Sequence, residues 1–251
     1  MYLDSNAKFG FKRESSRLMI LQDISFESPE ENILYDETLL RLAEEGRGGE
    51  VLRFWESSKL FVVLGRISRP EDDINIENAL RDRIPVLRRC SGGGTVLQGQ
   101  GCLNYSLILS KETSPELVNL KESYQFILGR VIHALKDLGV EALFRPISDI
   151  ALVGGAKKIS GNAQKRFRKF ILHHGTILYD FDLDAMGRYL RMPRAVPEYR
   201  LNRTHREFVA NIPAAANAIK NAIRKVFPAD SSASSQIISN FSLTSDAHVR
   251  C

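Results

Sequence analysis

The stretch RRCSGGGTVLQGQGCLNYSLIL, residues Arg88 to Leu109, places two arginines before three consecutive glycines and then returns to an apolar run with strand character. A glycine run between strands can simply form a sharp turn or a bulge. Glycines also let backbone N–H groups approach an anion closely, and guanidinium groups suit bidentate contacts with phosphate or carboxylate. Because neither GxxxxGK[ST] nor a dinucleotide-binding fingerprint is present, the stretch predicts a phosphate cradle of another kind.

Strand and helix signals occur in groups around this stretch. Helices are predicted over 32–47, 71–82, 115–138, 183–191 and 213–227, and strands over 51–56, 59–65, 84–89, 102–109, 142–144, 149–153, 157–166 and 170–179. The runs 51–56 and 59–65 are joined by a polar pair and are expected to form a hairpin. Strand pairs with helices between the groups indicate a single α/β domain with a largely antiparallel or mixed sheet.

Composition narrows the class of protein. The 251 residues are 43% hydrophobic and 26% charged, so the chain can bury a full core without disulfides. Its three cysteines, Cys90, Cys102 and Cys251, lack the spacing of a disulfide framework or a zinc site, which favours a cytoplasmic location. No apolar stretch is long enough for a membrane helix and the start lacks a secretory signal, so we expect no membrane association.

The net charge is +5, and several of the cations are concentrated in one short run. Six of them fall within thirteen positions: Lys157, Lys158, Lys165, Arg166, Arg168 and Lys169. Such a run can be a solvated face, an anion site or a surface for an acidic partner. Nucleic acid is not an expected partner, because no helix-turn-helix, zinc-finger or aromatic RNA-binding signature accompanies the cations.

A second segment, SDIALVGGAKKISGNAQKRFRKFILHHGTILY over 148–179, contains further candidate functional groups. Lys158 can neutralise a nucleotide phosphate or an activated carboxylate, or it can be an exposed strand lysine. Asp149, considered without its neighbours, would be only an acidic residue in a turn. His173 and His174 would face opposite sides of a strand, so at least one of them can be buried in the core.

Taken together, RRCSGGGTV with LNYSLIL, SDIALVGGAKKISGNAQKR and HHGTIL resemble the lipoate-protein ligase catalytic domain of the biotin/lipoyl ligase family in order and spacing. NILYDETLL, LRFWE and VVLGR resemble that family's first helix and hairpin. The resemblance implies the core shared with class II aminoacyl-tRNA synthetases, a mainly antiparallel mixed sheet flanked by helices. We therefore expect a lead-in over 1–29, a catalytic domain over 30–228 and a loose tail over 229–251.

The chemistry that the resemblance implies is ATP-dependent. Lipoate or octanoate would react with ATP, assisted by Mg²⁺, to give an acyl-adenylate and pyrophosphate, and the acyl group would pass to a lysine of a lipoyl-domain protein. The acceptor would resemble the glycine cleavage H protein or a dihydrolipoyl acyltransferase. The chain has no room for the accessory C-terminal domain of two-domain ligases, so a separate accessory ligase subunit or membership of a single-domain group is expected.

The resemblance also implies roles for individual residues. Lys158 would be catalytic and contact both adenylate and lipoate. The other expected ATP or adenylate contacts are Arg89, Gly94, Thr95, Val96, Leu97 and Asp149, and Asp149 would also lie near the metal. The expected lipoate contacts, besides Lys158, are Arg88, Ser91, Gly92, Gly93, Ser160, Gly161, Ala163, His174 and Gly175.

Other readings of the same scaffold stay open. Octanoyltransferases carry octanoate from acyl carrier protein through a cysteine thioester. Their nucleophile precedes the SDIALV-like strand or follows the HHGTIL-like strand, where this chain has LFRPIS and DFDLDAMGRYL without cysteine. A non-catalytic acyl-binding relative is a further alternative. Biotin ligase is more distant, because KISG with HHGTIL points to lipoate.

Overall fold

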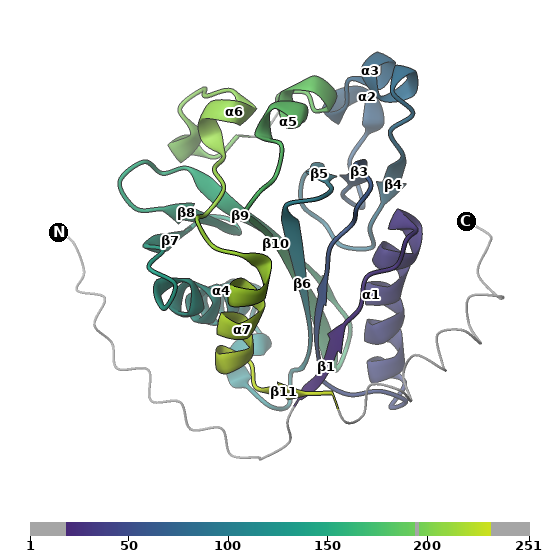
Figure 1. Cartoon of the computed structure of the whole chain (residues 1–251). Coiled ribbons are helices and arrows are strands. Elements are labelled where there is room, and N and C mark those ends of the chain that lie inside the picture. Colours follow the sequence, from purple (N-terminus) through teal and green to yellow (C-terminus); the bar gives the residue numbers. More distant parts are fainter. Residues whose placement is uncertain (1–18, 194–195, 232–251) are drawn as a thin grey trace.

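A mixed eight-stranded sheet dominates the computed structural model, which describes residues 19–193 and 196–231 (Figure 1). In spatial order its strands are β11 (Ala229–Asp230), β1 (Met19–Asp23), β2 (Val51–Trp55), β6 (Cys102–Ser110), β10 (Phe170–Leu178), β9 (Lys158–Arg166), β8 (Asp149–Leu152) and β7 (Ala142–Arg145). The pairs β11–β1 and β1–β2 are parallel, and all the others in this sheet are antiparallel. The predicted mainly antiparallel mixed sheet is therefore confirmed.

A smaller sheet carries the glycine-rich loop. It consists of β4 (Val86–Arg88), β3 (Phe61–Leu64) and β5 (Val96–Gln98), with β3 in the middle. The predicted hairpin of 51–56 with 59–65 is wrong, because β2 pairs with β1 and β6 while β3 pairs with β4 and β5. Both strands are buried throughout, and an apolar run predicts a strand without specifying its partner. The strand β5 was not predicted.

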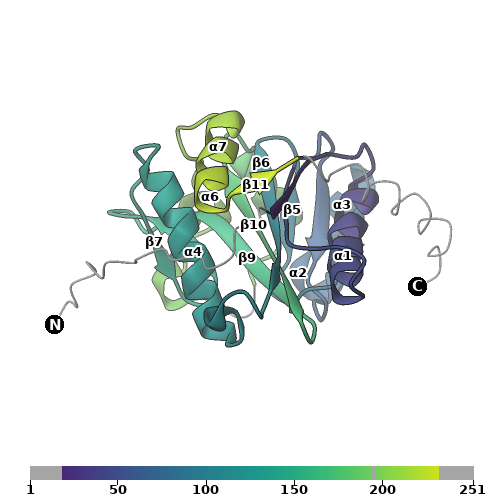
Figure 2. The same cartoon turned by 90° about the horizontal axis from the view of Figure 1, so that it is seen from below.

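Helices cover both faces of the large sheet (Figures 1 and 2). Helices α4 (Leu120–Lys136) and α7 (Ala216–Val226) lie together on one face, and α1 (Pro29–Glu44) packs against β10 and β6 on the other. Strand β6 serves both cores, since Leu107 packs on the α4 side and Ile108 on the α1 side. The shorter helices are α2 (Pro70–Asp73), α3 (Ile76–Arg81), α5 (Leu183–Tyr189) and α6 (His205–Phe208).

Side-chain caps fix where the long helices begin. The Ser28 hydroxyl accepts a hydrogen bond from the N–H of Glu31 at the start of α1. Residues 115–117 form only a 3₁₀ turn, and α4 starts later than predicted, because the Asn119 side chain accepts from the N–H groups of Lys121 and Glu122. Among the described residues, none of the helices is both long and apolar enough to cross a membrane.

Two strands differ from the expected loose lead-in and tail. β1 lies within 1–29, and β11 lies within 229–251, where it pairs with β1 through Met19 and Ala229. Short sheet-edge strands are held largely by backbone hydrogen bonds, so they need no strong side-chain alternation that the sequence would reveal. The rest of the predicted lead-in and tail, including Cys251, lies in residues 1–18 and 232–251, outside the described residues.

Candidate active site

A cavity of about 840 Å³ lies where the glycine-rich loop, β8, β9, β10 and the segment leading into α6 meet. Most of the residues predicted as ligand contacts border it: Arg89, Gly93, Gly94, Thr95, Val96, Leu97, Asp149, Lys158, Ser160, Gly161, Ala163, His174 and Gly175. Three predicted lipoate contacts, Arg88, Ser91 and Gly92, do not border it. The fold thus brings two distant sequence segments to opposite sides of one ligand-sized space.

Lys158 and Asp149 form an ion pair on the wall of this cavity. The Lys158 Nζ lies 2.7 Å from Asp149 Oδ1, and the second carboxylate oxygen of Asp149 accepts a hydrogen bond of 2.7 Å from the hydroxyl of Tyr199. Burial, and then the charge of Asp149, raise the pKa of Tyr199 above its ordinary value, so the phenol remains a neutral donor. The Lys158 side chain retains 27% exposure, so its ammonium is both oriented and accessible.

One position of the glycine run, Gly93, requires glycine for conformational reasons. Gly93 has a φ of +83°, and a Cβ placed there would lie 3.0 Å from Nη2 of Arg89. A Cβ on Gly65 would in turn meet the Gly93 carbonyl at 2.0 Å, so these two backbones touch. Gly92 and Gly94 have open space around them, and Gly94 borders the cavity. The loop therefore leaves uncovered backbone facing a ligand.

The two arginines before the loop have different partners. Arg89 is buried and donates to Ser91 Oγ and to the carbonyls of Gly92 and Gly94, so its guanidinium ties the loop together. Its predicted contact with an ATP phosphate stays a prediction. Arg88, predicted to contact lipoate, instead turns away from the cavity and donates to the carbonyls of Gly65 and Ser68.

The doubled histidine faces two environments, as the strand pattern predicted. His173 is fully buried between the rings of Tyr105 and Tyr124, and burial, with a smaller effect of His174, lowers its pKa to about 3. His173 is therefore a neutral core residue. His174 borders the cavity, with Nε2 2.6 Å from Ser91 Oγ and Nδ1 3.7 Å from Asp36 Oδ2.

Asp36 and Tyr199 border the cavity without having been predicted. The signal for Asp36 was available, because it is a carboxylate on the buried face of a helix between Tyr35 and Leu39. No local signal marks Tyr199, which comes from an irregular stretch that reaches the cavity only in the folded chain.

Two cysteines, Cys90 and Cys102, also border the cavity. Burial raises the pKa of Cys90 to about 12, with smaller effects of Glu37 and Asp36, and burial raises the pKa of Cys102 even more. Neither thiol is thus activated as a nucleophile in this environment.

Within the described residues, no group of three or more His, Cys, Asp or Glu side chains is arranged to hold a metal ion.

The sequence is similar to a known family and to several known proteins. Residues 28–227 match the family model described as the lipoyl protein ligase A/B catalytic domain. The lipoate-protein ligase LplJ of Bacillus subtilis is 34% identical over 151 residues, which make up 60% of this chain and 44% of that protein. The octanoyltransferase LipM of Brevibacillus brevis is 28% identical over 206 residues, covering 74% of each protein.

The fold has relatives among solved structures. A bipartite lipoate protein ligase from Thermoplasma acidophilum, studied with its E2 lipoyl domain, superposes with a TM-score of 0.72 at 22% identity, covering 92% of this chain and 94% of that one. At this identity the likeness shows the fold. This chain spans 34% to 46% of the length of three of the curated relatives that it matches.

Proposed function

Because the chain belongs to the lipoyl protein ligase A/B catalytic domain family, we propose that it attaches lipoate, or octanoate, to proteins in two ATP-dependent steps. The acid and ATP form an acyl-adenylate with release of pyrophosphate, and a lysine of the acceptor then displaces AMP. One observation carries the proposal: the cavity presents an oriented, accessible ammonium at Lys158 and, among its described residues, no activated thiol.

Lys158 has the geometry of a catalytic cation. When a carboxylate attacks the α-phosphate of ATP, negative charge accumulates in the transition state, and a fixed cation stabilises that charge without solvent reorganisation. Asp149 holds the Lys158 ammonium at 2.7 Å, and Tyr199 holds Asp149 in turn. Since the ion pair is partly exposed, the ammonium can exchange some of its contact with Asp149 for contact with the reacting groups.

The glycine-rich loop supplies the opposite side of the proposed nucleotide site. Backbone from Gly93 to Leu97 borders the cavity, and Thr95 is fixed by a 2.5 Å hydrogen bond from its Oγ1 to Asp73 Oδ2. Uncovered N–H groups of such a loop suit phosphate oxygens. Arg89 contributes a buried positive charge, because its pKa is lowered by burial only to about 10, far above neutral pH. We propose that it acts chiefly by holding this loop.

Mg²⁺ fits this site only as a partner of the nucleotide. Asp149, the carboxylate predicted to lie near the metal, already binds Lys158 and Tyr199, and the described residues contain no group of three or more His, Cys, Asp or Glu side chains that could hold a metal ion. Magnesium ions commonly keep their waters and are held by substrate phosphates with one or two carboxylates. If bound, the ion would neutralise phosphate charge, and Asp149 is the carboxylate that we propose would help to hold it.

The acyl chain needs an apolar part of the same cavity. Trp55, Val63, Tyr124 and Leu172 border the cavity, and the small residues Ala163 and Gly161 on β9 leave space beside that strand. We propose that lipoate lies here, with its carboxylate directed toward Lys158. Ser160 and Gly175 would line the same passage.

The proposed acceptors are lipoyl domains like those of glycine cleavage H proteins or dihydrolipoyl acyltransferases. The Thermoplasma relative was studied with an E2 lipoyl domain, and it is bipartite. We therefore also propose that a separate accessory subunit assists this chain, whose matched region is a minor share of several relatives.

Octanoyl transfer from acyl carrier protein is the second candidate, because the LipM relative matches across 74% of the chain. That reaction needs a thiolate to form a covalent acyl-enzyme. The raised pKa of Cys90, at about 12, works against it, since the thiol would stay protonated at neutral pH.

The decisive experiment incubates the full chain with lipoate or octanoate, Mg·ATP and several lipoyl domains, followed by intact mass measurement of both proteins. The ligase proposal expects an acylated lipoyl domain and pyrophosphate, both dependent on ATP. A parallel reaction supplies octanoyl-acyl carrier protein without ATP. An acylated lipoyl domain only in that second reaction, with a thioester adduct on the chain, would establish the transferase instead.

A further inference from the structure

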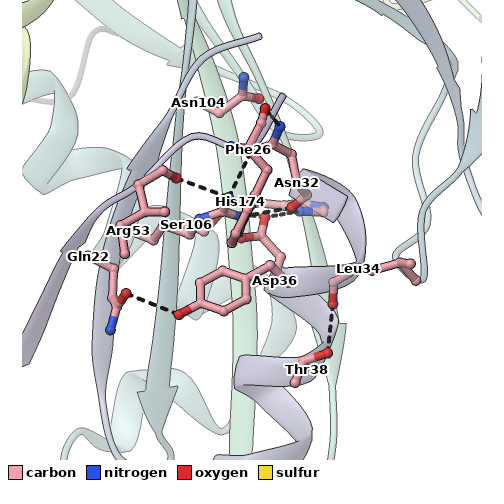
Figure 3. A network of polar contacts seen from close by, with 12 residues as sticks. Gln22, Phe26, Asn32, Leu34, Asp36, Thr38, Arg53, Asn104, Ser106 and His174 are labelled. Atoms are coloured by element: carbon pink, nitrogen blue, oxygen red, sulfur yellow. Dashed lines mark hydrogen bonds and ion pairs between the residues drawn. The ribbon is translucent and has the colours of Figure 1, made fainter. Parts of the chain in front are cut away.

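A second ion pair, Arg53 with Asp36, is almost fully buried, and only its Asp36 member borders the cavity (Figure 3). Arg53, in the middle of β2, is 0% exposed, and its Nη1 lies 2.6 Å from Asp36 Oδ1. The same guanidinium donates to the Asn32 side chain at 2.9 Å and to the Ile24 carbonyl at 3.1 Å. Its carbon lies 4.8 Å from the centre of the Tyr35 ring. Arg53 itself does not border the cavity.

Asp36 connects this arginine to the cavity. Its other oxygen, Oδ2, accepts a 2.6 Å hydrogen bond from Ser106 Oγ and lies 3.7 Å from Nδ1 of His174 (Figure 3). Burial alone would raise the pKa of Asp36, but Arg53, and then His174 and Ser106, together lower it below its ordinary value. Asp36 is therefore a carboxylate, and Arg53 is the main reason.

The contacts continue from His174 to the glycine-rich loop. His174 Nε2 lies 2.6 Å from Ser91 Oγ, and Ser91 Oγ accepts from Arg89 Nε at 3.0 Å. Because Ser91 already accepts from Arg89, its own proton is available for a hydrogen bond to Nε2 of His174. The ring proton then resides on Nδ1, facing Asp36. Arg89 completes the series by binding the carbonyls of Gly92 and Gly94.

The order Ser91, His174, Asp36 is that of a nucleophilic triad, but its surroundings differ. The Ser91 residue is 1% exposed and does not border the cavity. Its oxygen also accepts a hydrogen bond of 3.0 Å from Nε of Arg89. A nucleophile must reach the reacting carbon, so this serine is built to hold the loop rather than to attack.

We propose that Arg53 is a positioning residue for the acylation reaction proposed above. Through Asp36 it fixes the orientation and the proton of His174, and through Ser91 and Arg89 it fixes the glycine-rich loop that faces the ligand. Without the guanidinium, the buried carboxylate of Asp36 would take up a proton or turn away, because an unpaired buried charge is strongly unfavourable. His174 would then lose the group that orients its ring.

The test uses variants that remove the relay without leaving a buried charge. Arg53→Met alone leaves Asp36 unpaired, so the main variant is Arg53→Met with Asp36→Asn, which keeps the volume and removes both charges. Arg53→Lys is the conservative variant. Arg130→Met is the matched control, because Arg130 also lies over an aromatic ring, the partly buried Phe126, and donates to a carbonyl, yet it joins α4 to α7 away from the cavity.

Two readouts separate positioning from mere stability. Ring nitrogen chemical shifts of His174 in the ligand-free protein report its tautomer, and steady-state lipoylation reports kcat and KM. The double variant should fold, lose the Nδ1–H preference of His174 and lower kcat/KM by up to about a hundredfold, because a small misplacement of groups around a reacting centre can cost that much. Arg53→Lys should recover part of both, and Arg130→Met should change neither.

A double variant with an unchanged His174 tautomer and wild-type kcat/KM would overturn the proposal. A serine-directed fluorophosphonate that labels Ser91 would overturn it as well, because it would make Ser91 a nucleophile. The tautomer is measured without substrate, so it tests the relay even if the wild-type chain transfers no lipoate, an outcome that would instead remove the proposed function.

Discussion

The ion pairs Lys158–Asp149 and Arg53–Asp36 have similar separations, 2.7 and 2.6 Å, but opposite surroundings. The side chains of the first pair are 27% and 12% exposed, whereas those of the second are 0% and 4% exposed. A pair open to the cavity can exchange partners with a charged substrate. A buried pair cannot, and it serves to fix the groups around it. Accessibility, rather than pairing itself, thus distinguishes groups that meet the substrate from groups that position them.

The largest effect is expected at the open pair. Lys158→Ala should lower lipoate-dependent pyrophosphate release by about a hundred- to a thousandfold, the usual loss when one donor to a transition-state charge is removed. Its melting temperature should stay near that of the wild type, because the partly exposed lysine contributes little packing. Lys157→Ala is the control, since Lys157 is exposed and does not border the cavity. Equal rates for both variants would show that the accessible pair has no special role in the reaction.

The histidine pair provides a second contrast, in pH dependence. His173 has a pKa lowered from 6.5 to about 3, so between these values the unfolded chain binds a proton that the folded chain does not. The free energy of unfolding should therefore fall as pH decreases from 6.5 towards 3, with a contribution of at most about 1.4 kcal/mol per pH unit from this residue.

His173→Gln should flatten that pH dependence when urea unfolding is followed at several pH values. A wild-type protein whose stability is constant across this window would show that His173 is charged or exposed in the folded state.

The basic run contains both bound and free cations, and a smaller effect is expected there. Arg166 donates to the carbonyls of Leu117 and Val118 and is structural, whereas Arg168 and Lys169 are exposed at the turn between β9 and β10. Arg168→Glu with Lys169→Glu should slow acyl transfer to an acidic lipoyl domain by about tenfold and reduce its salt dependence, since rim charges mainly change association rates.

The same pair of reversals should leave pyrophosphate release unchanged. Stopped-flow measurement of each half-reaction at several salt concentrations separates the two effects. A parallel loss in both half-reactions would place this turn in the active site or in folding rather than at the acceptor surface.

The smallest effect is expected at the cysteines. Replacing Cys90 by Ser, Cys102 by Ala and Cys251 by Ser should keep ATP-dependent lipoylation within about tenfold, which corresponds to roughly 1.4 kcal/mol of activation free energy. Loss of activity from Cys90→Ser alone, together with a thioester-linked adduct in the unmodified protein, would favour the transferase. Intact mass before and after hydroxylamine treatment provides the measurement.

Most of the residues that the sequence predicted as ligand contacts border the cavity, but it predicted few of the groups behind them. Lys158, Asp149 and Gly94 stand in motifs that resemble those of a known family, and that resemblance implied that they share one site, whose cavity they all border. The serial contacts from Arg53 to His174 join β2, α1 and β10, and no local pattern encodes such a tertiary arrangement. An arginine within the apolar run VLRFW was the available hint.

Strand pairing was the other limit. Apolar runs predicted β2 and β3 correctly as strands, but their assignment to two different sheets depends on competition among all strands for partners. Arg88 and Arg89 are neighbours in sequence with the same charge, but successive side chains of an extended chain point in opposite directions. Arg88 therefore binds the carbonyl of Gly65, whereas Arg89 binds the carbonyl of Gly94 in the glycine-rich loop.

The pairing of β1 with β11 has a consequence for engineering. Met19 and Ala229 are register partners, so the first strand and the last strand of the described chain lie side by side. In Figure 1, β11 lies at the opposite end of the sheet from α5 and α6, which flank the cavity. A short peptide could therefore join these two positions, and new termini could be opened in an exposed turn such as that between β9 and β10. Such a circular permutant would keep every cavity-lining segment intact and would move the attachment point of a fused reporter from β1 and β11 to the turn between β9 and β10.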